Sequence, residues 1–462
     1  MSTDLSFVKK RKYPETRVMS GFMELLPEEQ IEFDKIKATI METYESFGFT
    51  ALDTPFIERL EILYAKDEGD RDVGENATLV YEIAPRGEEK EAKSGLRFDL
   101  TVPLARYVAD HFNDLSFPFR RCHISKVHRG ERAQKGRFRE FYQCDVDVIG
   151  HNTLSIRYDA EIPSIIYQLF KKLNFGKFTI RVNNRKLLNG LIESLECNAS
   201  IEQVLGVVDR IEKIEPSEFM KQLEELGLTD AMIDLLVRFF DIKGSNDDVL
   251  HHIKAFNIGN ENFVAGFNEL TTVVDFMKAL GVDDTYYKID PVVVRGMNYY
   301  TGTVYETMLD DHKELGSICG GGRFDNLASK YTKEHLPGVG ISIGLTRLFY
   351  KLREVGVIKC TTKTTAEVIV VPKDDSNILT ALNVSQRLRA EGFKVDVLLE
   401  SLNAKKQFSY VGRKDTPFTV VVGTEENQDG ATLQYKTTDG MIEKHAIELT
   451  ELATRIKKLY AL

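Results

Sequence analysis

The chain has 462 residues, of which 42% are hydrophobic and 29% charged, and its net charge is −10. This length is too great for one compact core, so we expect two or three domains, and the composition excludes a disordered chain. Five widely spaced cysteines argue against a disulfide framework, and we see no signal peptide or membrane-spanning run, so we expect a cytoplasmic protein without a membrane partner.

The sequence pattern of residues 1–185 predicts an antiparallel sheet flanked by helices. A first helix begins at Pro27, with acids in its first turn, and ends near Ser46. A second helix covers 155–172. Short β-like segments separated by polar loops lie at 50–52, 79–83, 95–98, 141–149 and 178–182.

The middle and the end of the chain differ from this pattern. Residues 186–285 contain amphipathic segments with few β-branched runs, which indicates a helical insertion. β character and glycine return at 286–355, which we assign to the second part of the first domain. After a linker at 361–365, strands and helices alternate through 365–462, which predicts a small parallel α/β domain.

A run of basic residues lies between Phe119 and Arg139, with Glu131 as its single acid. No glycine-rich phosphate-binding loop is present, so arginines must hold any phosphate. We expect a loop between two antiparallel strands that binds phosphate or an RNA end, although a solvated face is the alternative. The basic residues are Arg120, Arg121, Lys126, Arg129, Arg132, Lys135, Arg137 and Arg139.

The segment directly after this run alternates as a strand does. Phe141, Gln143, Asp145 and Asp147 share one face, which places an amide and two carboxylates where apolar residues are usual. The pattern predicts a pocket floor for a cationic or amine ligand, and an exposed sheet face is the alternative.

Several segments resemble one enzyme family. Residues 136–145 (GRFREFYQCD) resemble motif 2 of class II aminoacyl-tRNA synthetases in its histidyl form. Residues 295–302 (RGMNYYTG) and 320–325 (GGGRFD) resemble the two histidine-specific signatures, although each alone could be a turn. Residues 338–347 resemble motif 3, and Asp53-Thr54-Pro55 stands where the motif 1 proline belongs. The resemblance to histidyl-tRNA synthetases extends from about Met19 to the end of the chain.

The resemblance implies a fold and a reaction. The fold is an α+β catalytic domain of the class II type, formed by 1–185 and 286–355, with the helical insertion at 186–285 and an α/β anticodon-binding domain at 365–462. The implied enzyme is a homodimer that activates L-histidine with ATP and transfers it to the 3′ end of tRNA(His). Mg²⁺ is expected to bind through the ATP phosphates. Lys405-Lys406-Gln407-Phe408, on a predicted helix, would read the anticodon.

The resemblance also implies the role of each site residue. Arg295 and Arg129 are the implied catalytic residues, lying against the α-phosphate. No metal ligand is implied. The implied histidine-binding residues are Asp99, Thr101, Arg129, Gln143, Asp147, Arg295, Tyr299 and Tyr300. The implied ATP-binding residues are Arg129, Glu131, Arg137, Phe141 and Arg347.

Three positions depart from the family pattern, and two other functions compete with the enzyme. Asn298, Phe324 and Thr346 replace more usual residues. A regulatory, non-catalytic paralogue is the first alternative, but such chains lose the arginine signature and the anticodon-binding domain, both present here. An RNA-binding module that senses uncharged tRNA is the second, and it is expected inside a longer chain. His123 and His128 have no third ligand, so we expect them to be structural.

Overall fold

The computed structural model describes residues 13, 15–64, 79–84, 92–134, 136–294, 300–424, 427–437 and 441–460. The chain divides into two compact units. The first contains Lys37–Ile358 together with the segment that ends at Glu24, and the second contains Lys359–Leu462 together with Leu25–Ile36. Across the described ranges, every helix is too short or too polar to pass through a bilayer.

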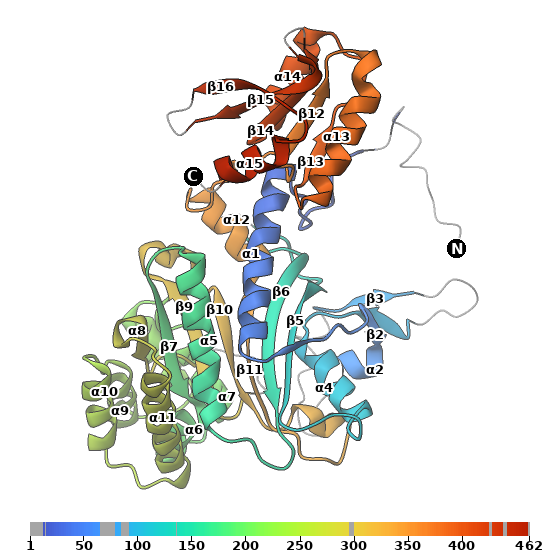
Figure 1. The fold of residues 1–462 in the computed structure, drawn as a ribbon. Helices are drawn as coiled ribbons and strands as arrows, with labels where there is room; N and C mark the ends of the chain where they lie inside the picture. The colour runs from blue at the N-terminus through green and yellow to red at the C-terminus, as the bar shows by residue number, and fades with distance from the viewer. Residues whose placement is uncertain are drawn as a thin grey trace. The chain divides into compact units, whose positions relative to one another are not determined.

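The first unit is built on an eight-stranded sheet with the order β1-β5-β6-β11-β10-β9-β7-β8 (Figure 1). The strands are β1 (Thr50–Ala51), β5 (Phe119–His128), β6 (Glu140–Ile149), β7 (Phe178–Asn184), β8 (Tyr287–Ile289), β9 (Thr303–Leu309), β10 (Cys319–Phe324) and β11 (Gly338–Gly344). Neighbours from β5 to β7 pair antiparallel, whereas the two outer pairs, β1 with β5 and β7 with β8, are parallel. The predicted antiparallel sheet is therefore confirmed for its six central strands.

Helices pack on this sheet through apolar stripes. The predicted first helix is confirmed as α1 (Pro27–Ser46), and the side chains of Ile40 and Tyr44 are fully buried. The hydroxyl of Tyr44 donates a hydrogen bond of 3.1 Å to the carbonyl oxygen of Cys144 in β6, which fixes the helix against the sheet. The other long helices of the first unit outside the insertion are α4 (Thr101–Asp110), α5 (Arg157–Leu173) and α12 (Leu345–Glu354).

A small second sheet precedes α4. The segments predicted as strands at 79–83 and 95–98 form β3 (Tyr81–Ile83) and β4 (Ser94–Leu96), which pair antiparallel. They join β2 (Ile57–Arg59) in a three-stranded sheet rather than extending the main one, and α2 (Leu60–Leu63) follows β2. Asp99 lies two residues before α4, and its Oδ1 accepts a 3.0 Å hydrogen bond from the N–H of Val102 in the first turn of that helix.

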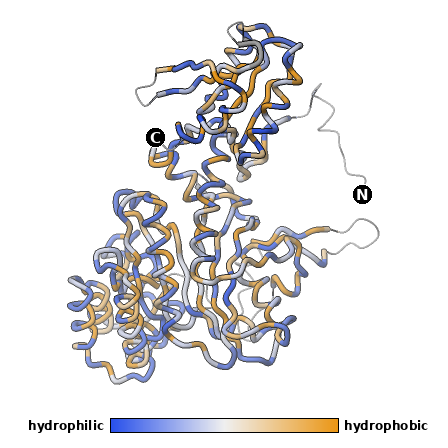
Figure 2. Tube along the Cα trace, in the orientation of Figure 1, coloured by the Kyte–Doolittle hydropathy of each residue, from blue (hydrophilic) through white to orange (hydrophobic). Residues whose placement is uncertain are grey.

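The predicted helical insertion is confirmed. Apolar and hydrophilic residues alternate along its helices, which gather near β7, the strand next to the edge strand β8 (Figures 1 and 2). The helices are α6 (Arg185–Glu193), α7 (Ile201–Val208), α8 (Pro216–Glu225), α9 (Asp230–Phe240), α10 (Asn246–Ala255) and α11 (Glu261–Ala279). Residues 186–285 contain 19 Asp and Glu against 8 Lys and Arg, so the insertion carries a net charge of −11.

Two glycines let α6 and α11 touch backbone to backbone. A Cβ atom on Gly190 would lie 2.1 Å from the nitrogen of Phe263, and one on Gly266 would lie 2.2 Å from the nitrogen of Leu187. Both distances are far below van der Waals contact. Only glycine permits this crossing, which packs the last helix of the insertion against its first.

The second unit contains a five-stranded sheet with the order β13-β12-β14-β15-β16. β12 (Val368–Pro372), β13 (Val395–Val397) and β14 (Phe418–Thr424) are parallel, as predicted. β15 (Asn427–Lys436) and β16 (Ile442–Ile447) are antiparallel, so the prediction of a purely parallel domain was wrong. β16 is an edge strand with mostly exposed residues, so it lacks the apolar alternation that marks a strand. The helices are α13 (Ile378–Ala390), α14 (Ala404–Lys414) and α15 (Leu452–Tyr460).

Candidate active site

Two adjoining pockets lie over the central strands of the main sheet. The larger has a volume of about 400 Å³ and the smaller about 220 Å³. Both are lined by residues of β6, β10 and β11, which lie next to one another in the sheet. The residues common to both pockets are Arg129, Gln143, Ser317, Gly320 and Ser342.

The larger pocket is basic. Arg129, Arg137, Arg347 and Lys351 line it, and Glu131 is the acid among its lining residues. Guanidinium groups match the oxygens of phosphate in pairs of hydrogen bonds, and several of them together neutralise a multiply charged anion. This pocket is therefore suited to a nucleoside polyphosphate.

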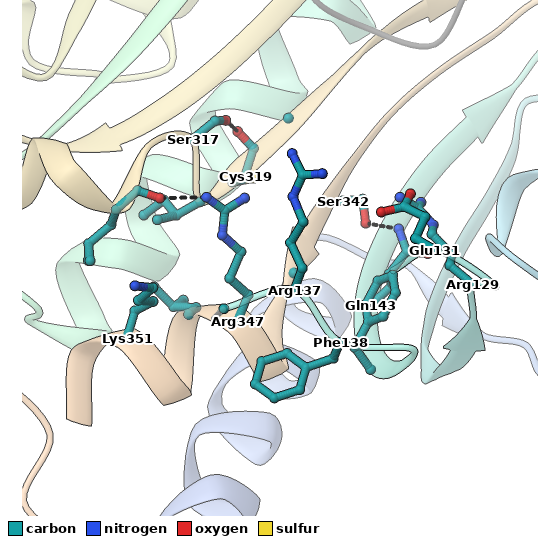
Figure 3. A pocket seen from close by; sticks show the side chains of 17 residues that line it. Arg129, Glu131, Arg137, Phe138, Gln143, Ser317, Cys319, Ser342, Arg347 and Lys351 are labelled. Carbon is teal, nitrogen blue, oxygen red and sulfur yellow. Dashed lines mark hydrogen bonds between the residues drawn. The ribbon is translucent and has the colours of Figure 1, made fainter. Parts of the chain in front are cut away.

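An aromatic ring and two guanidinium groups add a surface for a planar ligand. Phe141 lines the larger pocket, and the guanidinium carbon of Arg129 lies 5.2 Å from the centre of its ring. Arg347 reaches from α12, and its Nη2 donates a hydrogen bond of 2.7 Å to the carbonyl oxygen of Leu315 (Figure 3). A planar base could stack on Phe141 and on a guanidinium group, as cation–π geometry favours.

The smaller pocket is acidic. Asp99, Asp145, Asp147 and Glu306 line it, and Arg129 is the base among its lining residues. Within the described residues, four buried acceptors of this pocket receive no hydrogen bond from the protein: Oδ2 of Asp99, Oδ1 of Asp145, Oδ2 of Asp147 and Oε1 of Gln143. Buried acceptors require donors, so this pocket is suited to a ligand that carries several N–H groups and a positive charge.

Burial changes the pKa values of these carboxyl groups. Burial raises the pKa of Asp147 to about 7, although the charge of Arg121 opposes the increase. Burial likewise raises the pKa of Asp99 to about 6 against the hydrogen bond from Val102 and the charge of Arg129. The smaller pocket thus holds acids that titrate close to neutral pH, which is typical of functional sites.

Arg121 pairs with Asp147, one of the acids that line the smaller pocket. Its Nη1 lies 2.9 Å from Oδ2 of Asp147, and the side-chain exposures are 0% and 4%. The two groups form a close ion pair whose angles fall outside those of a hydrogen bond. Nη2 of Arg121 donates to the carbonyl oxygen of Leu100, which joins the floor to the start of α4.

Glycines in β10 and β11 make room for the acidic pocket. Gly320–Gly322 lie in strand β10, which excludes the alternative that this triplet is only a turn. A Cβ atom on Gly340 would lie 2.0 Å from Oδ1 of Asp147, and one on Gly321 would lie 2.1 Å from the carbonyl oxygen of Gly340. Any side chain at these positions would fill the space beside the buried carboxylate.

The basic run is only partly the predicted loop. Arg120, Arg121 and Lys126 lie on strand β5, so their placement in a loop was wrong. Arg120 pairs with Glu161 of α5 at 2.9 Å rather than facing a ligand. The loop between β5 and β6 carries Arg129, Arg132, Arg137 and Arg139, of which Arg129 and Arg137 line the larger pocket, and Lys135 lies outside the described residues.

The predicted site residues fall into three groups. Arg295 and Tyr299 lie outside the described residues. The residues expected to bind ATP all line the larger pocket: Arg129, Glu131, Arg137, Phe141 and Arg347. The remaining residues expected to bind histidine all line the smaller pocket: Asp99, Thr101, Arg129, Gln143, Asp147 and Tyr300.

The structure describes two of the three residues that depart from the family pattern. Phe324 is 3% exposed and lines the smaller pocket, where its ring presents no polar atom. The hydroxyl oxygen of Thr346 accepts a 2.8 Å hydrogen bond from the N–H of Tyr142, so this residue joins α12 to β6. Asn298 lies outside the described residues.

The two histidines of β5 have protein partners. Nε2 of His123 lies 2.7 Å from Oδ1 of Asp53, and Nε2 of His128 lies 3.0 Å from Oε2 of Glu140. These contacts confirm that both histidines are structural. Four polar pocket residues that the sequence did not single out lie on separate elements: Glu306 on β9, Ser317 before β10, Ser342 on β11 and Lys351 on α12.

Comparisons with known proteins agree with this geometry. Residues 21–348 match the histidyl-tRNA synthetase family model, and residues 367–459 match that of an anticodon binding domain. The histidine–tRNA ligase of Clostridium tetani is 49% identical over 418 residues, which cover 90% of this chain and 93% of that protein.

Solved structures show the same relationship. The histidyl-tRNA synthetase of Nostoc sp. PCC 7120 is 40% identical with a TM-score of 0.85, covering 96% of this chain and all of that one. A Bacillus halodurans protein described as an ATP phosphoribosyltransferase regulatory subunit/histidyl-tRNA synthetase has a TM-score of 0.70 at 21% identity, covering 86% of this chain and 97% of that one. The second likeness shows the fold alone. The sequence match and the two pockets together show that this chain belongs to the histidyl-tRNA synthetase family.

Proposed function

We propose that this protein activates L-histidine with ATP, giving histidyl-adenylate and pyrophosphate, and then transfers histidine to the 3′ end of tRNA(His). One observation carries the proposal. A basic pocket and an acidic pocket adjoin, and Arg129 lines both. An amino acid with a cationic group and a nucleotide with anionic phosphates can therefore lie side by side with one guanidinium group between them.

The geometry suggests how the first step proceeds. Asp99 and Gln143 accept hydrogen bonds from the α-ammonium group, and Asp147 and Tyr300 face the imidazole. The histidine carboxylate attacks the α-phosphorus in line, the bond to the β-phosphate oxygen breaks, and pyrophosphate leaves. Arg129 stabilises the negative charge that develops on the α-phosphate oxygens, because a fixed cation needs no reorganisation as that charge forms. By family resemblance, Arg295 acts beside it.

In this proposal ATP is a substrate, and its metal ion enters the site bound to it. We place the adenine between Phe141 and Arg347 and the phosphates near Arg137 and Glu131. The described residues contain no group of three His, Cys, Asp or Glu side chains arranged to hold a metal ion. We therefore propose that Mg²⁺ binds through the ATP phosphates, where it neutralises part of their charge.

The test is ATP–pyrophosphate exchange with each of the twenty amino acids in turn. Exchange that depends on histidine alone would support the proposal, because it reports adenylate formation and specificity together. No exchange with any amino acid, from a folded protein that binds neither ATP nor histidine, would contradict it and favour the regulatory paralogue.

Histidine binding at about pH 6.5 is expected to release protons. The pKa values of Asp99 and Asp147, about 6 and about 7, mean that both are partly protonated there. The bound α-ammonium group favours the ionised carboxylate of Asp99 and lowers its pKa, so protons leave and affinity for the cation rises with pH across this window. Calorimetry in two buffers of different ionisation enthalpy counts the protons released. Asp99→Asn should release fewer protons per histidine, and equal release from both proteins would contradict the assignment.

We also propose roles for the other parts of the chain. Residues 1–185 and 286–355 form the catalytic domain, with a homodimer contact through the motif 1 region. The insertion at 186–285 contacts the acceptor arm of the tRNA, and residues 365–462 read the anticodon. Phe408 of α14 is 65% exposed beside the exposed Lys405 and Lys406, a combination that suits single-stranded RNA. We place the protein in the cytoplasm.

Lys405→Glu is expected to lower kcat/KM for tRNA charging by roughly tenfold, because one phosphate contact becomes a repulsion. Pyrophosphate exchange is expected to stay unchanged, since the two pockets belong to the other unit. Lys458→Glu on α15 makes the same charge change at another exposed lysine and serves as the control. A similar loss of charging in both variants would indicate a general effect of charge and contradict a specific contact at α14.

A further inference from the structure

One buried guanidinium group lies next to Glu306, a residue that lines the smaller pocket. Arg181 of β7 is 7% exposed and has three carboxylates around it. Its Nε donates to Oδ2 of Asp290 at 2.8 Å, and its Nη1 and Nη2 donate to the two oxygens of Glu212 at 3.2 and 2.8 Å. Its Nη1 also lies 3.5 Å from Oε2 of Glu306, the longest of these contacts.

The three carboxylates belong to different parts of the first unit. Glu306 stands opposite Arg181 on the neighbouring strand β9 and lines the smaller pocket. Asp290 follows β8, and its Oδ1 accepts a 3.2 Å hydrogen bond from the N–H of Val292. Glu212 lies between α7 and α8 of the insertion, and its side chain is 53% exposed. Arg181 therefore connects the insertion with the wall of the acidic pocket.

Glu212 and Glu306 compete for Nη1 of Arg181, whereas Asp290 also pairs with Lys288 at 3.1 Å. A guanidinium group makes its strongest contacts as paired hydrogen bonds, and in Arg181 the paired geometry goes to Glu212. If Glu212 moves away, Arg181 can turn toward Glu306 and neutralise more of its charge. The negative potential of the smaller pocket then falls, and a cationic ligand binds there less tightly.

We propose that Arg181 is a positioning residue through which the helical insertion sets the affinity of the smaller pocket for its cationic amino acid. The inference rests on the proposed function, because that function makes histidine the ligand of this pocket. It adds a physical link by which a movement of the insertion changes histidine binding.

The test is Glu212→Gln, which keeps the shape of the side chain and removes its charge. We expect KM for histidine in pyrophosphate exchange, and Kd for histidine by calorimetry, to rise by about three- to tenfold, a range common for residues that couple two sites. KM for ATP and kcat are expected to stay within about twofold. Glu212→Asp, which restores the charge, is expected to recover most of the affinity.

Glu215→Gln is the matched control. Glu215 is exposed and belongs to the same insertion, and within the described part of the chain its side chain does not cap α8, which follows it, so this variant is expected to behave as the unaltered protein. An unchanged KM for histidine in Glu212→Gln would overturn the link, and so would a parallel loss in kcat and in both KM values, which indicates a merely structural role. Failure of the unaltered protein to bind histidine would instead overturn the proposed function, and this inference with it.

Discussion

Arg129→Ala is expected to lower histidine-dependent pyrophosphate exchange by about 10²–10³-fold, the usual cost of losing one fixed donor to a developing charge. Arg129 lines both pockets, so its guanidinium group is the cation best placed between the amino acid carboxylate and the α-phosphate. Its Nε donates to the carbonyl oxygen of Phe98 at 3.1 Å, which orients the group. The loss is expected mainly in kcat, because the charge that it stabilises forms in the transition state.

Arg132→Ala provides the control for this prediction. Arg132 belongs to the same loop between β5 and β6, is exposed, and is absent from the lining of both pockets. Its removal changes the net charge equally and is expected to leave exchange within about threefold. Comparable losses in the two variants would show that the loop acts by its overall charge, and near-normal kcat in Arg129→Ala would rule out the proposed role.

Arg323→Ala is expected to lower the free energy of unfolding by about 3–5 kcal/mol, because it leaves a buried carboxylate without its partner. Nε and Nη2 of Arg323 donate to the two oxygens of Asp159 at 3.0 and 2.7 Å, and the side-chain exposures are 7% and 0%. Nη2 also donates to the carbonyl oxygen of Leu154 at 3.1 Å. Arg323 belongs to the second histidine-specific segment, yet it ties β10 to α5 rather than contacting a pocket.

Arg238→Ala is the comparison for this pair. Arg238 and Asp234 are 2.9 Å apart on α9, with side-chain exposures of 64% and 65%. An exposed pair of this kind contributes at most about 1 kcal/mol, because water screens both charges. Urea unfolding followed by circular dichroism measures both variants, and a similar small change in the two would contradict a structural role for the buried pair.

The types and the order of the elements were predictable from local patterns. The helix predicted from Pro27 to near Ser46 matches α1, and the helix predicted at 155–172 matches α5 within two residues. The predictions failed where the pairing of strands decides whether a charged residue is buried. Strand β5 contains charged residues that a local pattern assigns to solvent, and Arg121 is buried only because Asp147 of β6 lies opposite it.

The sequence predicted the residues of the site better than their surroundings. Asp147 and Gln143 were recognisable because polar residues at alternate positions of a strand are unusual on a buried face. Glu306 and Ser342 carry no such signal, since each sits in an ordinary strand pattern and meets the pocket only through the order of the sheet. The place of Arg181 depends on three carboxylates from separate elements, which no local pattern brings together.

The acidic insertion has a consequence for how RNA approaches. Its net charge of −11 exceeds that of the whole chain, −10, so the rest of the protein is close to neutral with local basic sites. A polyanion is repelled from the insertion and attracted to pockets such as that of Arg137 and Arg347. The negative charge of the insertion therefore opposes non-specific binding of RNA to its helices. The proposed contact of the insertion with the acceptor arm must then depend on shape and a few hydrogen bonds rather than on charge.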